Sequence, residues 1–240
     1  MDGDVLIERA AMSAPLVDAA AIAVFRAAPG IVGPEMRGLI QGAGLTSGAI
    51  VIDMAEFVAA GRLDRPLIEV RYRYGEVDGL DGLLAEWEEH GLLSEDGPSA
   101  GLVALCGHIL DLRHRVAERL WNPATATAVG EATMDAVRFG GGPLLAAGME
   151  LPLPATPQAR CHHALNLMRW ARHGAHAGAW LTRGLTADET VALQHSDHPA
   201  ARVLIDQIER DTNVWCIPMV SAIGIRFDGW ISGLERLSNL

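Results

Sequence analysis

The stretch CHHALNLMRWARHGAHAGAW, residues 161–180, has the composition and periodicity of one helix, and four of its twenty residues are histidine. At about 100° per residue, its polar and aromatic side chains collect on one stripe and its small and apolar side chains on the opposite side. The stripe consists of His162, Asn166, Arg169, His173, His176 and Trp180, and the opposite side consists of Ala164, Leu167, Met168, Ala171, Ala175 and Gly178.

The stripe is open to several interpretations. One interpretation is a solvated face, although such faces are normally rich in Glu, Lys and Gln. Another is a core helix whose histidines form hydrogen bonds with neighbouring carbonyl groups. A metal ion bound by His173 and His176, with His162 further back, needs a further ligand from elsewhere. We favour a metal-free site in which these three histidines do acid/base chemistry and Arg169 holds an anion.

Outward from this helix, the N-terminal third shows the order helix, turn, helix, strand, which is typical of a winged helix. The expected elements are a helix over 13–28 with Ser13 as N-cap and an end before Pro29-Gly30, a helix over 35–41, a turn at 42–44, a helix over 48–60, and a strand in the alternating segment 68–74. A second unit of this kind consists of an amphipathic helix from Leu80 to Gly91, a turn over 95–98, and a strong helix over 102–121 with a 3.6-residue apolar period.

The Gly- and Pro-rich segment 139–156 marks a boundary between domains. After it, Gly184 ends the histidine-rich helix, Thr186 and Glu189 form an expected capping box, and a helix follows over about 200–209. We therefore predict a mainly α fold with winged-helix-like modules and a C-terminal helical domain. The expected domains are 1–75, 76–150 and 151–240.

Composition excludes several classes of chemistry. The chain has no lysine, which removes a lysine Schiff base, a pyridoxal-phosphate linkage and a phosphate-loop lysine. There is no GxGxxG with a following acid, and the three cysteines are too few and too scattered for a disulfide framework.

No run approaches the roughly 18 apolar residues of a membrane span, and the acidic N-terminus does not resemble a signal peptide. We expect a cytoplasmic protein without cofactor or metal and without a membrane partner.

Charge argues against DNA as the partner. The net charge is −11, whereas DNA-binding surfaces are basic because they neutralise phosphates. The candidate recognition helix over 48–60 carries Asp53 and Glu56 and no basic residue, although Arg, Lys, Asn and Gln are the usual readers of base edges. DNA binding is therefore disfavoured.

Two segments resemble the actinomycete helix-turn-helix family that is often labelled SalK-like. They are LLAEWEEHGLLSEDG, with the following RHRVAERLW, and LMRWARHGAHAGAWLTRGLTADETVAL. The family's GDGH element reads His173-Gly174-Ala175-His176 here, so the final histidine is kept while Gly174 replaces the aspartate. The two segments also occur in the reverse order. The resemblance implies a fold and an actinomycete origin more than a reaction.

The candidate site combines residues from two segments that are far apart in the sequence, 53–73 and 162–180. Asp53 lies within an apolar helix, so it needs a partner such as Arg71 or Arg73 if it is buried. We predict an enzyme or ligand-binding protein of specialised metabolism that takes an anionic small molecule and performs elimination, cyclisation, isomerisation or hydrolysis. The alternatives are a ligand-responsive transcription regulator or a non-catalytic partner, as a homodimer or hetero-complex. The predicted catalytic residues are His173, His176, His162 and Asp53, and the predicted substrate-binding residues are Arg169, Arg71, Arg73, Asn166, Trp170 and Trp180.

Overall fold

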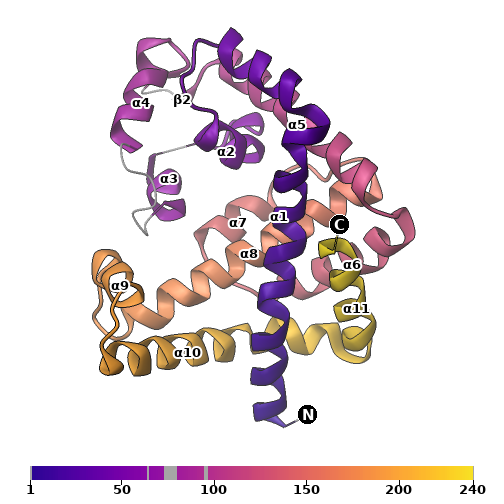
Figure 1. Cartoon of the computed structure of the whole chain (residues 1–240), viewed down its shortest axis with the longest axis vertical. Coiled ribbons are helices and arrows are strands. Elements are labelled where there is room, and N and C mark those ends of the chain that lie inside the picture. The colour runs from indigo at the N-terminus through magenta and orange to yellow at the C-terminus, as the bar shows by residue number, and fades with distance from the viewer. Residues whose placement is uncertain (1, 64, 73–79, 95–96, 240) are drawn as a thin grey trace.

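Helix α8, Pro157–Leu181, is the element around which the other helices pack (Figure 1). It contacts α1, α5, α6, α7 and α10. Thr156 caps its first turn by accepting a hydrogen bond from the amide of Ala159, and Pro157 occupies the first helical position, where its missing N–H has no cost. The helix ends at Leu181, and Gly184 lies three residues later in the turn that follows, with a φ of 72° that favours glycine.

The computed structural model describes residues 2–63, 65–72, 80–94 and 97–239. Within them the fold is mainly α, which confirms the predicted class. The elements besides α8 are α1 Gly3–Gly42, α2 Ala49–Ala59, α3 Arg65–Arg71, α4 Leu80–Glu89, β1 Leu93–Ser94, β2 Gly97–Pro98, α5 Ala100–Leu120, α6 Pro123–Val137, α7 Pro143–Met149, α9 Ala187–Gln194, α10 Pro199–Ile223, the 3-10 turn η1 Gly224–Arg226 and α11 Phe227–Ser238.

The first helix is longer than predicted. Asp2 caps α1 by accepting a hydrogen bond from the amide of Asp4, so Ser13 is not the N-cap, and the helix continues through Pro29 to Gly42. Proline removes one backbone hydrogen bond and normally ends or kinks a helix. Here α1 packs against α5, α8, α10 and α11, and these contacts hold it beyond the local stop signal.

The predicted strand over 68–74 is wrong in its described part, because residues 65–71 form α3. Leu67 and Ile68 are adjacent and both buried, which a helix turned toward the core permits and a half-exposed strand does not. Arg73 lies outside the described residues. The small hairpin occurs later, where Leu93 pairs with Pro98 in an antiparallel register. The winged-helix-like order is therefore α2, α3, α4 and then β1–β2.

The apolar helix α2 is not a surface. Ile50, Val51, Met54 and Phe57 are almost completely buried. They belong to one hydrophobic cluster that extends from Ala10 to Leu237 and crosses both expected domain boundaries, although the three-part division itself stays a prediction. Helices α6 and α7, which the sequence analysis did not assign, complete the packing around α8.

Helix α10 also exceeds its prediction, since it runs from Pro199 to Ile223 with Pro218 inside it. Before it, the capping box of Thr186 and Glu189 is present as predicted. The tail is packed, because the buried Trp230 donates a hydrogen bond to Thr133.

Two segments, Gly3–Gly42 and Pro199–Ser238, are long and apolar enough to cross a membrane by length and composition. Core helices of soluble proteins pass the same test, so this is weak evidence for a span. Both segments pack against other helices of the fold.

Candidate functional site

The histidine stripe of α8 has different surroundings at its two ends. His162 and Asn166, in the first half, are 2% and 3% exposed and face the packed core. Arg169, His173 and His176, in the second half, line a cavity. The same face of one helix therefore serves packing at one end and a cavity at the other.

The cavity has a volume of about 670 Å³ and lies between α1, α8 and α10, with one side chain from α3. Small residues of α1, including Ala10, Ala11 and Ala14, leave room for it. Met168, Trp170, Val17, Met219 and Val220 give it apolar walls, while its polar residues include Arg71, Arg169, Arg172, His173, His176 and Glu209. Its size is within the usual range of small-molecule sites, and so is its mix of apolar walls and a few polar groups.

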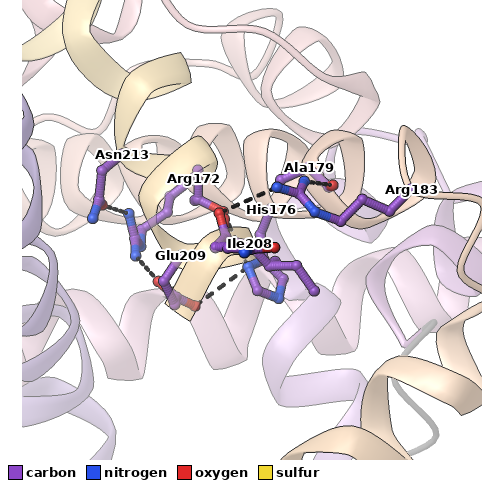
Figure 2. Close-up of polar contacts among 9 residues, drawn as sticks. Arg172, His176, Ala179, Arg183, Ile208, Glu209 and Asn213 are labelled. Carbon is purple, nitrogen blue, oxygen red and sulfur yellow. Dashed lines mark hydrogen bonds and ion pairs between the residues drawn. The ribbon is translucent and has the colours of Figure 1, made fainter. Parts of the chain in front are cut away.

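One carboxylate connects two cavity residues of α8. Glu209, on α10, accepts a 2.7 Å hydrogen bond from Arg172 and lies 3.4 Å from Nδ1 of His176 (Figure 2). Arg172 also donates to the side-chain oxygen of Asn213 at 2.8 Å (Figure 2). Burial lowers the pKa of His176, and the charge of Arg172 lowers it further, while Glu209 opposes both effects. His176 is therefore neutral near pH 7.

Two further arginines lie where the main cavity meets a second cavity of about 240 Å³. Arg169 and Arg71 line both cavities. Arg169 forms an ion pair of 2.7 Å with Asp18, and Arg71 forms one of 2.9 Å with Asp53. The predicted pairing of Asp53 with Arg71 is present. These guanidinium groups are oriented by carboxylates and still line the cavities.

Asp53 has a second partner in Tyr72, whose hydroxyl donates to it at 2.8 Å. Burial raises the pKa of Tyr72, and the negative charge and hydrogen bond of Asp53 raise it further. The phenol therefore stays protonated and helps to fix the carboxylate at the edge of the second cavity, which Asp53 lines.

His173 has a different local role from His176. Its Nε2 lies 3.0 Å from the backbone oxygen of Val70 on α3. A carbonyl oxygen only accepts hydrogen bonds, so this nitrogen carries a proton. His173 thus joins α8 to α3 at the wall of the cavity.

A second polar group lies in the core, away from the described cavities. Glu56 of α2 accepts hydrogen bonds of 2.9 Å from Arg113 of α5 and from His163 of α8. Their side chains are 11%, 3% and 4% exposed. Burial raises the pKa of Glu56, but the hydrogen bond from His163 and the charge of Arg113 more than offset this and lower it well below its usual range.

His162 lies next to this buried group. Its ring centroid is 5.5 Å from that of Phe25 and 6.1 Å from that of Trp121. Burial and the nearby Arg113 lower the pKa of His162 to about 3, so the ring is neutral. Within the described part of the chain, its Nε2 has no hydrogen-bond partner.

The predicted site residues therefore separate into groups. Arg71, Arg169, Trp170, His173 and His176 line the main cavity, and Asp53 lines the second. The structure places three predicted residues away from the described cavities, namely His162, Asn166 and Trp180, of which Trp180 packs with Ile208 in a small separate cluster. Among the described residues, no group of three or more His, Cys, Asp or Glu side chains is placed to hold a metal ion.

The sequence analysis missed Arg172, Glu209 and Asn213. The predicted helix stopped at residue 209, whereas α10 continues to Ile223. The prediction therefore did not include the helix face that carries Glu209, Asn213 and Cys216. Glu209, Asn213 and Cys216 are spaced by four and three residues, and positions with this spacing share one helix face. This spacing was the signal in the sequence that could have revealed them.

The fold and cavity define a mainly helical protein with a polar-lined cavity. Residues 104–216 match a helix-turn-helix family, a little under half of the chain. The match includes α8 and most of α10 and excludes α2 to α4 and the β1–β2 hairpin. Comparison with curated proteins and with solved structures finds no match.

Proposed function

We propose that the cavity between α1, α8 and α10 binds an anionic small molecule, and that His176 and His173 provide acid/base groups to it. The observation that carries this proposal is the combination of a cavity of about 670 Å³ with apolar walls, three arginines and two histidines. Such a cavity suits an amphipathic ligand with one charged end.

Arg169 and Arg71 are the proposed anion holders. A carboxylate or phosphate on the ligand would replace Asp18 at Arg169, and the guanidinium fork suits either group. The side chain of Asp18 is 52% exposed, so it can return to water when displaced. Trp170 and Met168 would contact the apolar part of the ligand.

The proposed reactions are elimination, cyclisation, isomerisation or hydrolysis without an organic cofactor. His176 is neutral and lines the cavity, which suits a general base. We also propose a cytoplasmic location, and the resemblance to the SalK-like family suggests a role in actinomycete specialised metabolism.

Filling the cavity from α1 tests ligand binding. Ala14 lines the cavity and is half-buried, so Ala14→Phe should place a ring where the ligand lies. Titration with the amphipathic anion anilinonaphthalene sulfonate, followed by fluorescence, should show binding that the variant weakens at least about tenfold, or ~1.4 kcal/mol.

Ala23→Phe is the matched control, because Ala23 is also a half-buried alanine of α1 but does not line the described cavities. It should bind the probe like the unchanged protein. Equal binding by all three proteins, or no binding by the unchanged protein, contradicts the proposed site.

The second candidate function is a ligand-responsive transcription regulator. The helix-turn-helix match and the order α2, α3, α4, hairpin favour it. The helix before the hairpin argues against it, because Asp81, Glu88 and Glu89 of α4 are exposed and would face phosphates. Tight, salt-sensitive retention of genomic DNA fragments in a low-salt filter-binding assay would favour the regulator over the enzyme.

A homodimer or a hetero-complex also remains a proposal. The sequence analysis based it on the apolar helix over 48–60, and the structure buries that helix in the core. Native mass spectrometry of the chain alone and with products of neighbouring genes is the test.

A further inference from the structure

We propose that Thr212 and Glu209 hold His176 in the tautomer that carries its proton on Nδ1, which leaves Nε2 as the basic nitrogen. Both are positioning residues that act through His176. Its use in catalysis rests on the proposed function, whereas the tautomer is a property of the protein without ligand.

The hydroxyl of Thr212 provides the first argument. Its Oγ1 lies 2.8 Å from the backbone oxygen of Ile208, in the preceding turn of α10, and 3.2 Å from Nδ1 of His176. A hydroxyl has one proton, and the oxygen of Ile208 can only accept it. Toward His176, Thr212 is therefore an acceptor, and Nδ1 must carry the proton. Thr212 is fully buried, so water does not replace this contact.

Glu209 provides the second argument. Its Oε1 lies 3.4 Å from the same Nδ1, and its Oε2 accepts the hydrogen bond from Arg172 (Figure 2). A carboxylate oxygen next to an unprotonated ring nitrogen would bring two lone pairs together. A proton on Nδ1 makes the contact favourable, and it is the same proton that Thr212 requires.

The arrangement has a chemical consequence at the other ring nitrogen. His176 is neutral near pH 7 because burial and Arg172 lower its pKa. A neutral ring with a proton on Nδ1 has its lone pair on Nε2. When Nε2 takes a proton, the positive charge that develops lies beside Glu209, which stabilises it.

This geometry defines a substrate class. The substrate would be an anionic molecule with an ionisable C–H or O–H group near His176. In the reaction step, the lone pair of Nε2 forms the new N–H bond, and the electrons of the broken C–H or O–H bond stay on the substrate. The arginines that line the cavity are placed to stabilise that added negative charge.

Nitrogen-15 NMR of protein labelled in its histidine side chains tests the proposal without any substrate. His176→Gln identifies the signals of His176 by their loss. At pH 7.5 we expect a protonated Nδ1 and an unprotonated Nε2. In the Thr212→Val/Glu209→Gln variant both acceptors are weakened, and the Nε2 signal should move toward the position of a protonated nitrogen.

Asp211→Asn is the control. It breaks the ion pair of 2.6 Å between Asp211 and Arg183, which joins α10 to the turn after α8 and does not touch His176. The tautomer should not change. A protonated Nε2 in the unchanged protein, an unchanged tautomer in the double variant, or an equal change in Asp211→Asn would overturn the proposal. Failure of probe binding alone overturns the proposed function and leaves the tautomer standing.

Discussion

Glu56→Gln is expected to destabilise the protein by about 3–5 kcal/mol, because it leaves a buried guanidinium without its counter-charge. The side chain of Arg113 is 3% exposed, and its guanidinium carries a positive charge. Its Nη2 donates to Glu56, its Nη1 donates to the backbone oxygen of Ile52, and the guanidinium lies 4.7 Å from the ring centroid of Phe25. Of these groups only Glu56 is negatively charged.

Urea unfolding followed by tryptophan fluorescence measures the effect as a shift in the free energy of unfolding. Glu35→Gln is the matched control, because Glu35 pairs with Arg115 at the surface, where both side chains are about half exposed. Surface pairs contribute about 0–1 kcal/mol. A loss from Glu56→Gln no larger than that of the control would contradict the interpretation.

The Arg113→Met/Glu56→Gln double variant separates the ion pair from general packing. Replacing both charges removes the uncompensated charge, so the double variant should lose less stability than the sum of the two single variants. Additive losses would show that the two side chains act independently.

Helical periodicity predicted the residues on each face of α8 but not what each face contacts. His162 and His176 were placed on one stripe, and the structure places both on one helix. Their surroundings differ because α1 and α5 enclose the N-terminal half of α8, while α1 and α10 leave a cavity beside the C-terminal half. Which helix lies opposite a given turn depends on long-range packing, and no local pattern reports it.

Residues that cap a helix or leave it through a turn predicted the helix ends well. Prolines, which only remove one backbone hydrogen bond, did not. Gly184 lies in the turn after α8, and the box of Thr186 and Glu189 starts α9 as predicted. Pro29 and Pro218 lie inside helices, because the packing of α1 and α10 outweighs the loss of one backbone bond. The helix predicted over 200–209 ended too early for a different reason, since no stop signal lies there, and Glu209 was therefore placed at a helix end.

The buried polar group was the least predictable feature. Glu56 was interpreted as an acid that would repel phosphate, which treats it as exposed. In the structure its carboxylate meets Arg113, 57 residues away in the sequence, and His163, 107 residues away. The charges that make its burial possible come from other helices, so no spacing within residues 48–60 indicates them.

Stability is expected to fall as the pH drops below about 6.5, and His162 should make a large contribution to this loss, to which His114 and His176 add in the same direction. Its pKa is lowered to about 3 in the folded protein and is near the ordinary value of 6.5 in the unfolded chain. Between these values the unfolded state binds a proton that the folded state does not bind. The free energy of unfolding should therefore decrease by roughly 1 kcal/mol per pH unit in this window.

Glu56 acts in a lower and separate window. Its folded pKa is below the unfolded value of about 4.5, so its contribution is present above that pH and is lost as the pH falls further. The range from pH 6.5 to 4.5 therefore reports on His162 together with His114 and His176, whose pKa values burial also lowers, and the range below pH 4.5 adds Glu56.

His162→Leu should reduce the slope of the pH dependence between 6.5 and 4.5, because leucine has a similar volume and does not titrate, while His114 and His176 keep the remaining slope. At pH 7.5 it should cost about 1 kcal/mol, because leucine loses the hydrogen bond of the ring to the backbone of Ala21 but keeps the apolar contacts beside Phe25 and Trp121. Urea unfolding across this pH range gives the slope. The exposed His195, replaced by leucine, is the control and should leave the slope unchanged. An unaltered slope in His162→Leu would mean that this buried ring is not a group that takes up a proton on unfolding.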